Sequence, residues 1–249
     1  MLQRYFFQIS YKGTNYYGWQ RQSKQISIQQ VIEDQFHKLF GQKITIVGCG
    51  RTDTGVHASD YYFHCDIPVK FDSLKLVFKL NRMLPSDIAV KSIRQMSKEA
   101  HARFDAKART YHYKIHTAKS PYLIDLSTYI PQCLDFQKMN QAAKYMLGKQ
   151  DFTSFSKLHT DVKNNICEVY SAQWIQSNED NWYFEIKANR FLRNMVRAIV
   201  GTLIDVGLNK IDSQDVVEII NALDRGKAGK SVPAQGLYLA KIEYPMFSS

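Results

Sequence analysis

The chain has 249 residues, of which 45% are hydrophobic and 22% charged, ordinary values for a globular protein that exclude a disordered or fibrous chain. Lysine and arginine number 33 against 23 acidic residues, and the resulting net charge of +10 favours a polyanionic partner such as nucleic acid. No apolar run reaches the roughly 18 residues that a membrane span needs, and no secretory signal is recognisable, so we expect a cytoplasmic protein.

Hydrophobic periodicity predicts a mixture of strands and helices along the whole chain. In chain order, the expected strands are 4–11, 43–47, 61–67, 88–93, 109–116, 168–175, 182–188 and 236–244. The expected helices are 28–40, 74–83, 136–147, 192–207 and 213–223. Ser27 and Gln30 give the first helix the spacing of a capping box.

The two parts of the chain have a similar content of strands and helices. This content predicts an α+β fold with an N-terminal half over residues 1–104 and a C-terminal half over 105–249. No linker rich in proline or glycine separates the halves, so we expect them to share one continuous structure.

Glycines and polar residues that can take part in chemistry are most concentrated in the segment 48–58, whose sequence is GCGRTDTGVHA. Its glycines allow a sharp turn. A phosphate-binding loop would need Lys and Ser or Thr where Val56 and His57 stand, and a dinucleotide fingerprint would need glycine at Asp53, so neither reading holds. The segment 229–231 lacks the first glycine of a phosphate loop and is expected to be a basic surface loop.

The local sequence around Asp53 allows two interpretations of its role. Asp53 can cap the turn and pair with a neighbouring cation such as Arg51. Alternatively, its carboxylate, which is normally ionised at neutral pH, can act as a nucleophile or a base. A turn at the end of a strand is a place where a ligand can reach such a group.

The histidines and cysteines near this turn do not predict a metal site. His57, His64, Cys49 and Cys65 match no four-ligand zinc spacing, and the signature of a zinc-dependent deaminase is missing. The cysteines of the chain lie far apart and form no CxxC pair, so we expect reduced thiols and no metal.

Two further residues stand out by their position within a predicted element. On the strand 109–116, Tyr111 either packs within a half-buried sheet or stacks under a nucleic-acid base. On the helix 192–207, Arg197 falls at the edge of the apolar arc and should be half-buried. Its guanidinium can reach solvent or meet a buried carboxylate.

Six blocks of the sequence together resemble the tRNA pseudouridine synthase A family. In chain order they are YKGTNYYGWQRQ (11–22), GRTDTGVHA (50–58), HARFDAKARTYHY (101–113), DFTSF (151–155), KANRFLRNMVRAIVGTLIDVG (187–207) and GLYL (236–239). They follow the order of the family over nearly the whole chain.

The resemblance implies isomerisation of uridine to pseudouridine at positions 38 to 40 of the tRNA anticodon stem-loop, without a cofactor. Asp53 matches the catalytic aspartate, and Tyr111 matches the tyrosine that stacks on the target uracil. Arg197 matches the arginine that pairs with the aspartate, Arg51 a basic loop residue that touches RNA, and Leu237 an apolar residue of the pocket.

The resemblance also implies the pseudouridine synthase fold, in which two similar α/β halves share a central, mostly antiparallel sheet with flanking helices. The first half would carry the catalytic aspartate loop and the second would complete the cleft. The tRNA would cross a homodimer, with its target base flipped out. The residues leave open a silent RNA-binding module, a synthase for another RNA, and the choice between attack at C1′ or C6 and proton removal at C2′.

Overall fold

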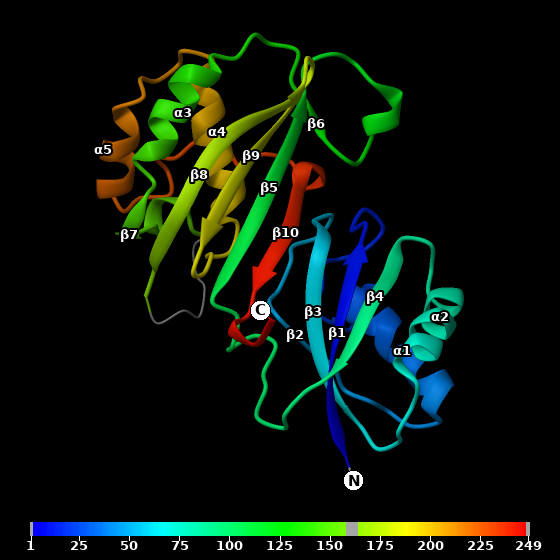
Figure 1. Cartoon of the computed structure of the whole chain (residues 1–249). Coiled ribbons are helices and arrows are strands. Elements are labelled where there is room, and N and C mark those ends of the chain that lie inside the picture. The colour runs from blue at the N-terminus through cyan, green and yellow to red at the C-terminus, as the bar shows by residue number, and fades with distance from the viewer. Residues whose placement is uncertain (1, 158–163, 248–249) are drawn as a thin grey trace. The chain divides into compact units, whose positions relative to one another are not determined.

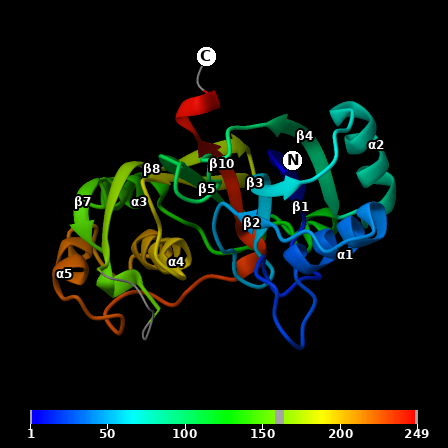
Figure 2. The same ribbon diagram turned by 90° about the horizontal axis from the view of Figure 1, so that it is seen from below.

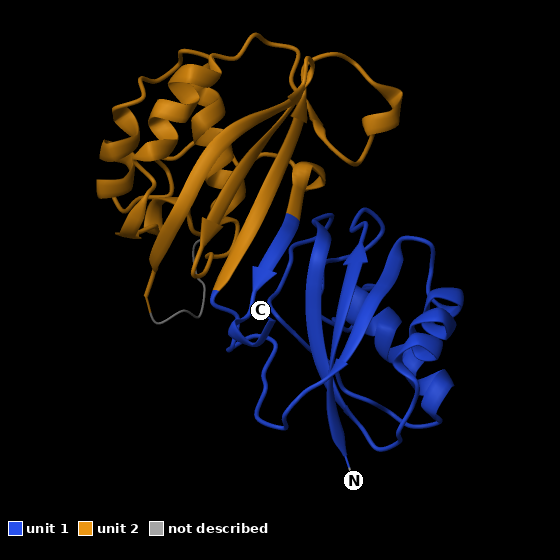
Figure 3. Ribbon diagram, in the orientation of Figure 1, with its two compact units in different colours: residues 1–107, 239–249 blue, residues 108–238 orange. Residues whose placement is uncertain are grey.

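The computed structural model describes residues 2–157 and 164–247. The chain forms two compact units (Figure 3): unit 1 comprises Met1–Lys107 with Leu239–Ser249, and unit 2 comprises Ala108–Tyr238. Both units combine helices with strands that pair mainly as antiparallel neighbours (Figure 1), which confirms the predicted α+β class. The division into functional halves at residue 104 stays a prediction, and it does not include the return of the last residues to unit 1.

Unit 1 is built on antiparallel pairs in which β1 is central. Its strands are β1 (Gln3–Tyr11), β2 (Val47–Gly48), β3 (His57–Ile67), β4 (Ile88–Gln95) and most of β10 (Leu237–Glu243), and its helices are α1 (Ile28–Phe40) and α2 (Ser73–Met83). β1 pairs with β3 on one side and β4 on the other, and β2 adds to β3. Both helices lie on one side of these strands (Figure 2). A short 3-10 turn, Pro245–Phe247, follows β10.

The core of unit 1 is aromatic. The rings of Phe7 and Phe63 stack at a centroid distance of 4.9 Å, and those of Trp19 and Tyr61 stack at 4.2 Å. Phe36 of α1 packs against the first pair. These rings pack the strands that flank the segment 48–58, so both ends of the predicted turn are anchored in a rigid core.

The sequence around α1 shows one prediction confirmed and one wrong. The helix has the predicted bounds, its N-cap Ser27 accepts a hydrogen bond from the Gln30 amide, and Gly41 ends it with a φ of 70°. The expected strand 43–47 does not form, because its backbone bonds to α1 instead: the Ile46 amide donates to Glu33 and the Ile46 carbonyl accepts from Gln29. Only β2 pairs as a strand there.

Unit 2 is a second, mostly antiparallel arrangement. Its strands are β5 (Ala108–His116), β6 (Thr128–Tyr129), β7 (Gly148–Asp151), β8 (Ile166–Asn178) and β9 (Asn181–Ala188). Its helices are α3 (Phe136–Lys144), α4 (Met195–Gly207) and α5 (Asp215–Asn221), with 3-10 turns at Pro121–Leu123, Thr153–Phe155 and Ala234–Gly236. β5, β9, β8 and β7 pair in that order as antiparallel neighbours, and β6 is parallel to β5.

The helices of unit 2 lie together on one side of its strands (Figure 2), with α3 packed on β8 and on α4. The sequence predicted α4 from residue 192, but the helix begins at Met195 because Asn194 adopts a left-handed φ of 68°. The short strands β6 and β7 were not predicted, since a few residues show no alternation. No helix in the described parts of the chain has the length and apolar character of a membrane span.

Candidate functional site

The turn that carries Asp53 is closed by its own backbone. The Val56 amide donates to the Asp53 carbonyl over 3.2 Å, and Gly55 takes a φ of 77°, which a side chain would oppose. Asp53 itself is half-buried, whereas Arg51 is exposed and Thr52 is buried. The turn is shorter than the segment 48–58, because Gly48 pairs in β2 and β3 already begins at His57.

The segment 13–19 cradles this turn from one side. The Trp19 amide donates to the Thr52 carbonyl, and the Gly55 amide donates to the Tyr16 carbonyl, both over 3.3 Å. The Thr52 hydroxyl is 2.9 Å from the hydroxyl of Tyr11 at the end of β1. The turn is therefore bound on both flanks of Asp53 by groups that belong to one neighbouring stretch of chain.

Two glycines let the cradle come this close. A Cβ at Gly13 would overlap the carbonyl oxygen of Val56, and a Cβ at Gly18 would overlap the carbonyl oxygen of Thr52. Gly18 also has a φ of 78°, so a side chain there would be strained in any case. The backbones thus interlock, and the position of Asp53 follows from the path of residues 13–19.

The histidine that follows the turn, His57 at the start of β3, has a structural partner. Nδ1 of His57 accepts a hydrogen bond from the Gly13 amide over 3.0 Å, and the side chain is buried. In residues 2–157 and 164–247, no group of three or more His, Cys, Asp or Glu side chains is placed to hold a metal ion. His57 therefore helps to dock the cradle onto the turn.

Tyr111 lies in the middle of β5, in unit 2. It pairs in register with Ile186 of β9 and is half-buried, and its ring meets the Phe191 ring edge to face at a centroid distance of 5.1 Å. Its neighbour Tyr113 is buried, and the Tyr113 hydroxyl donates to the Pro233 carbonyl over 2.9 Å. The strand thus combines a packed tyrosine with one that keeps part of its surface open.

Arg197 lies on the first turn of α4 and is half-buried, as the helical periodicity predicts. Its Nε donates to the Val232 carbonyl over 2.7 Å, while the Val232 amide donates back to the Arg197 carbonyl over 3.2 Å. Burial raises the pKa of Tyr113, and the hydrogen bond with Thr128 and the positive charge of Arg197 act in the opposite direction. Main chain and side chain together fix the direction of the guanidinium.

A loop over residues 225–232 supports this arginine. Arg225 donates from Nη1 to the carbonyls of Ala228 and Gly229 and from Nη2 to the Ser231 hydroxyl, over 3.3, 3.2 and 2.9 Å. The loop lies so close to α4 that a Cβ at Gly201 would overlap the carbonyl oxygen of Lys230. Lys230 itself is exposed, in agreement with the expected basic surface loop.

Leu237 is buried, with 6% of its surface exposed, and is the first residue of β10. Asp53 and Arg51 thus belong to unit 1, and Tyr111, Arg197 and Leu237 belong to unit 2. Within unit 2, the structure places Tyr113 in the electrostatic range of Arg197. The pairing of Asp53 with Arg197 stays a prediction.

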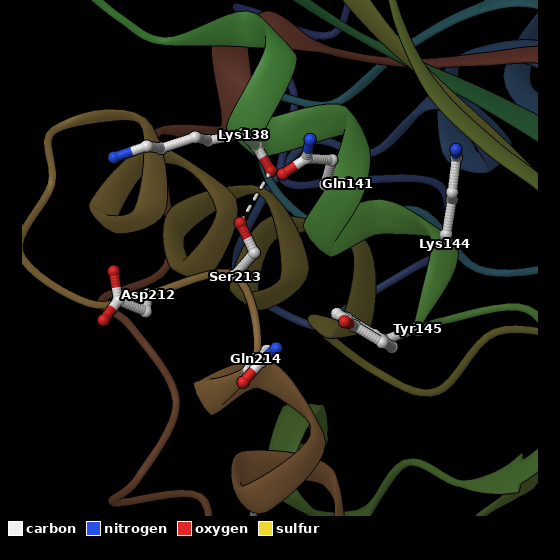
Figure 4. A pocket seen from close by; sticks show the side chains of 7 residues that line it. All are labelled: Lys138, Gln141, Lys144, Tyr145, Asp212, Ser213 and Gln214. Carbon is white, nitrogen blue, oxygen red and sulfur yellow. Dashed lines mark hydrogen bonds between the residues drawn. The ribbon is translucent and has the colours of Figure 1, made fainter.

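A surface pocket of about 490 Å³ lies between α3 and the approach to α5 (Figure 4). The lining residues are Lys138, Gln141, Lys144, Tyr145, Asp212, Ser213 and Gln214. Ser213 is tied to the pocket wall by a hydrogen bond from its hydroxyl to the Lys138 carbonyl. None of the residues predicted for the functional site lines this pocket, so it is not where the sequence motifs gather.

The segment 11–22 is one of the family motifs, but the role of the cradle within it is not predicted from the sequence. The available signal is the pair of glycines, Gly13 and Gly18, among tyrosines and a tryptophan, where glycine would otherwise weaken the packing. The loop that supports Arg197 was also missed, because its contacts join residues far apart in sequence.

The chain forms two compact α+β units, and unit 1 presents an aspartate on a tightly held turn. Comparisons with known proteins assign a chain of this kind to a class of RNA-modifying enzymes. A family model described as tRNA pseudouridine synthase matches residues 8–105 and 142–245. The chain belongs to this family of isomerases. The matched residues include the aspartate turn and all of α4.

Relatives under one name match the chain almost from end to end. A protein of Bacteroides fragilis named tRNA pseudouridine synthase A is 49% identical over 98% of this chain and 97% of its own length. The proteins of that name from Bacteroides thetaiotaomicron and Porphyromonas gingivalis are 46% and 45% identical, over 98% and 97% of this chain and 91% and 97% of their own lengths.

Proposed function

We propose that this protein converts uridine to pseudouridine at positions 38 to 40 of the tRNA anticodon stem-loop, with Asp53 as the catalytic carboxylate. The observation that carries the proposal is the half-buried Asp53 on a turn that the segment 13–19 locks in place, in a chain of the tRNA pseudouridine synthase family. A carboxylate that must meet one atom of a bound nucleotide needs this degree of preorganisation.

The reaction breaks the N1–C1′ bond, turns the uracil while it stays bound, and forms a C5–C1′ bond. The proton on C5 leaves and N1 gains one, so atoms and electrons balance without a redox partner or cofactor. Asp53 can attack C1′ or C6, or remove a proton at C2′. All three routes need the same carboxylate close to the ribose and the base.

The other predicted residues have roles that follow from their surroundings. Tyr111, half-buried beside Phe191, would stack on the flipped uracil. Arg197, held through its Nε, would present its remaining nitrogens to the Asp53 carboxylate as donors of charge-assisted hydrogen bonds. Leu237 would close the apolar wall of the pocket, and the exposed Arg51 would contact RNA phosphate or base.

The test is tritium release from tRNA that carries tritium at C5 of its uridines, with no metal or nucleotide added. We expect the wild type to release tritium and Asp53→Asn to lose at least about a thousandfold in rate. Asp34→Asn is the matched control, because Asp34 is an exposed carboxylate of unit 1 whose ion pair with Arg21, over 3.7 Å, lies at the surface. Equal release by wild type and Asp53→Asn would remove Asp53 from the chemistry.

The target positions need a separate measurement. Stem-loops that retain a single uridine, at position 38, 39 or 40, should each release tritium, whereas ribosomal RNA fragments should not. If tRNA binds and neither protein releases tritium, the protein is a silent RNA-binding module.

The proposal includes a homodimer that the tRNA crosses, in the cytoplasm where tRNA is used. It rests on the family resemblance of the motifs. Light scattering at micromolar concentration should give twice the 28.9 kDa mass of one chain. A monomeric mass with full activity would remove the dimer from the proposal.

A further inference from the structure

The outer face of α2 in unit 1 combines exposed apolar and basic side chains. Leu74 is 82% and Phe78 is 65% exposed, and Lys75, Lys79 and Arg82 beside them are also exposed. The opposite side of the helix buries Leu76 and Leu80 against the β4 side of the unit. We call the five exposed residues the α2 outer face.

This face is unfavourable for an isolated surface helix. Lys75 and Lys79 are four residues apart, where like charges repel each other on a helix. The sequence of α2, SLKLVFKLNRM, holds no acidic residue to offset them, and the N-cap Asp72 uses its carboxylate to accept from the Leu74 and Lys75 amides. A polyanion on this face would relieve the repulsion.

The helix is held rigidly enough to present these groups. The Asn81 side chain donates to the Val90 carbonyl over 2.9 Å and accepts from the Val90 amide over 2.7 Å, which ties α2 to the outer edge of β4. The Arg82 guanidinium lies 5.8 Å from the centre of the Phe78 ring. The Phe78 ring and the Arg82 guanidinium therefore form one contact surface.

The spacing of the cations fits a nucleic-acid backbone. At about 1.5 Å of helix rise per residue, the step from Lys75 to Arg82 covers about 10 Å. A strand of double-stranded DNA carries one phosphate per roughly 3.4 Å of axis, and the phosphates of an RNA duplex lie somewhat closer along the axis, so the row of three cations spans about three phosphates or slightly more. An exposed phenylalanine within this row can pack on a base or a ribose.

The chain also connects this face with the aspartate turn. Asp87, which lies between α2 and β4, contacts the cradle and the residue before it: its carboxylate accepts from the Tyr16 hydroxyl over 2.5 Å, and its carbonyl accepts from the Lys12 amide over 2.9 Å. The C-terminal end of α2 thus approaches the cradle side of unit 1, and Lys79 and Lys75 lead away from it.

We propose that the α2 outer face binds the sugar–phosphate backbone of tRNA away from the reacting nucleotide and supplies affinity without taking part in the chemistry. The partner is taken as tRNA on the strength of the proposed function. A polyanion is favoured over a second copy of the chain because a copy with a net charge of +10 would bring more positive charge to a basic face.

The test compares two double variants with the same change in charge. Lys75→Glu with Lys79→Glu alters the α2 outer face, and Lys38→Glu with Lys43→Glu alters two other exposed lysines of unit 1. tRNA binding is measured between about 50 and 200 mM salt, and single-turnover tritium release at saturating tRNA. Circular dichroism and light scattering check folding and oligomeric state.

We expect the α2 variant to bind tRNA about tenfold more weakly than the control, with the slope of log affinity against log salt reduced by about 1.5 to 2. The rate at saturation should not change. Phe78→Ala should weaken binding with an unchanged slope. Equal affinity and slope for both double variants would overturn the inference, as would loss of the dimer in the α2 variant, which would make the face an interface between copies.

The same experiment separates this inference from the proposed function. If no protein releases tritium but the α2 variant still binds tRNA more weakly than the control with a reduced slope, the face is an RNA-binding surface and the catalytic proposal fails. If the wild type releases tritium and both double variants bind alike, the catalytic proposal holds and the α2 inference fails.

Discussion

The two units hold their predicted site residues by different means. In unit 1, Asp53 lies on a turn, and the neighbouring backbone at Gly13 and Gly18 fixes that turn by passing too close for any side chain. In unit 2, Arg197 lies on a buried helix, and the side chain of Arg225 braces the loop that grips it. The position of the Asp53 carboxylate therefore depends on the absence of side chains at Gly13 and Gly18, whereas the orientation of the Arg197 guanidinium depends on the side chain of Arg225.

The substitution expected to disturb the aspartate turn of unit 1 most strongly is Gly13→Ala. Its Cβ would overlap the Val56 carbonyl, so the turn or the cradle must shift, and a displacement of about 1 Å can cost a hundredfold in rate. We expect kcat/KM for tritium release to fall about a hundredfold. Gly50→Ala is the control for folding, since its Cβ would meet no atom within 4 Å. Wild-type kcat/KM in folded Gly13→Ala would contradict the cradle.

The corresponding change in unit 2 is Arg225→Ala. It removes three hydrogen bonds from the loop 228–231 and leaves Val232 less able to orient Arg197, so we expect the single-turnover rate to fall about tenfold. Arg225→Lys cannot bridge all three acceptors and should lie between the two. Lys227→Ala, an exposed cation of the same loop, should leave the rate at saturating tRNA unchanged. If both alanine variants lose rate equally, the loop acts through its charge.

The smallest expected effect is a difference between the two units in how their folding stability depends on pH. His64 in unit 1 is 4% exposed, its Nδ1 accepts from the Ala102 amide, and burial, with help from Arg4 and His101, lowers its pKa to about 4. Asp66 and Asp105 act in the opposite direction. The unfolded state binds the proton first as pH falls below about 6.5, so folding stability is lost between about pH 6.5 and 4.

Between pH 7 and 5.5, unit 1 should lose about 1 kcal/mol of stability through this group. Hydrogen exchange of the β1 and β3 amides should accelerate accordingly, and more than that of β5 and β9. Burial also lowers the pKa of His116 in unit 2, so the contrast is one of degree. In His64→Gln the exchange of β1 and β3 should become less sensitive to pH. A larger pH response in unit 2 would contradict the assignment.

Where local pattern and packing agree, the sequence was a sufficient guide. The capping residue Ser27 and the apolar face of α1 specify that helix within the helix itself. The strand expected over 43–47 failed because side chains of α1 bond to the Ile46 backbone, and such a contact leaves no trace in local alternation. Hydrophobic periodicity predicts elements that pack along a regular face. The conformation of an irregular segment depends instead on single contacts with residues far away in the sequence.

The candidate site divides along the same line. The motifs point to Asp53, Tyr111 and Arg197 because these residue types in that order match the family. Gly13 acts on Val56, far along the chain, and the loop that Arg225 braces reaches Arg197 through the Val232 carbonyl. Local sequence patterns do not predict either contact.

The return of β10 to unit 1 has a consequence for synthesis on the ribosome. The Tyr244 hydroxyl donates to the Ala102 carbonyl, and its ring packs on Phe6 and Tyr62, while the Lys107 amide donates to the Glu243 carbonyl. All of unit 2 is translated between these partners, which at about 5 to 20 residues per second takes on the order of ten seconds. During that time the nascent unit 1 keeps part of its aromatic core uncovered.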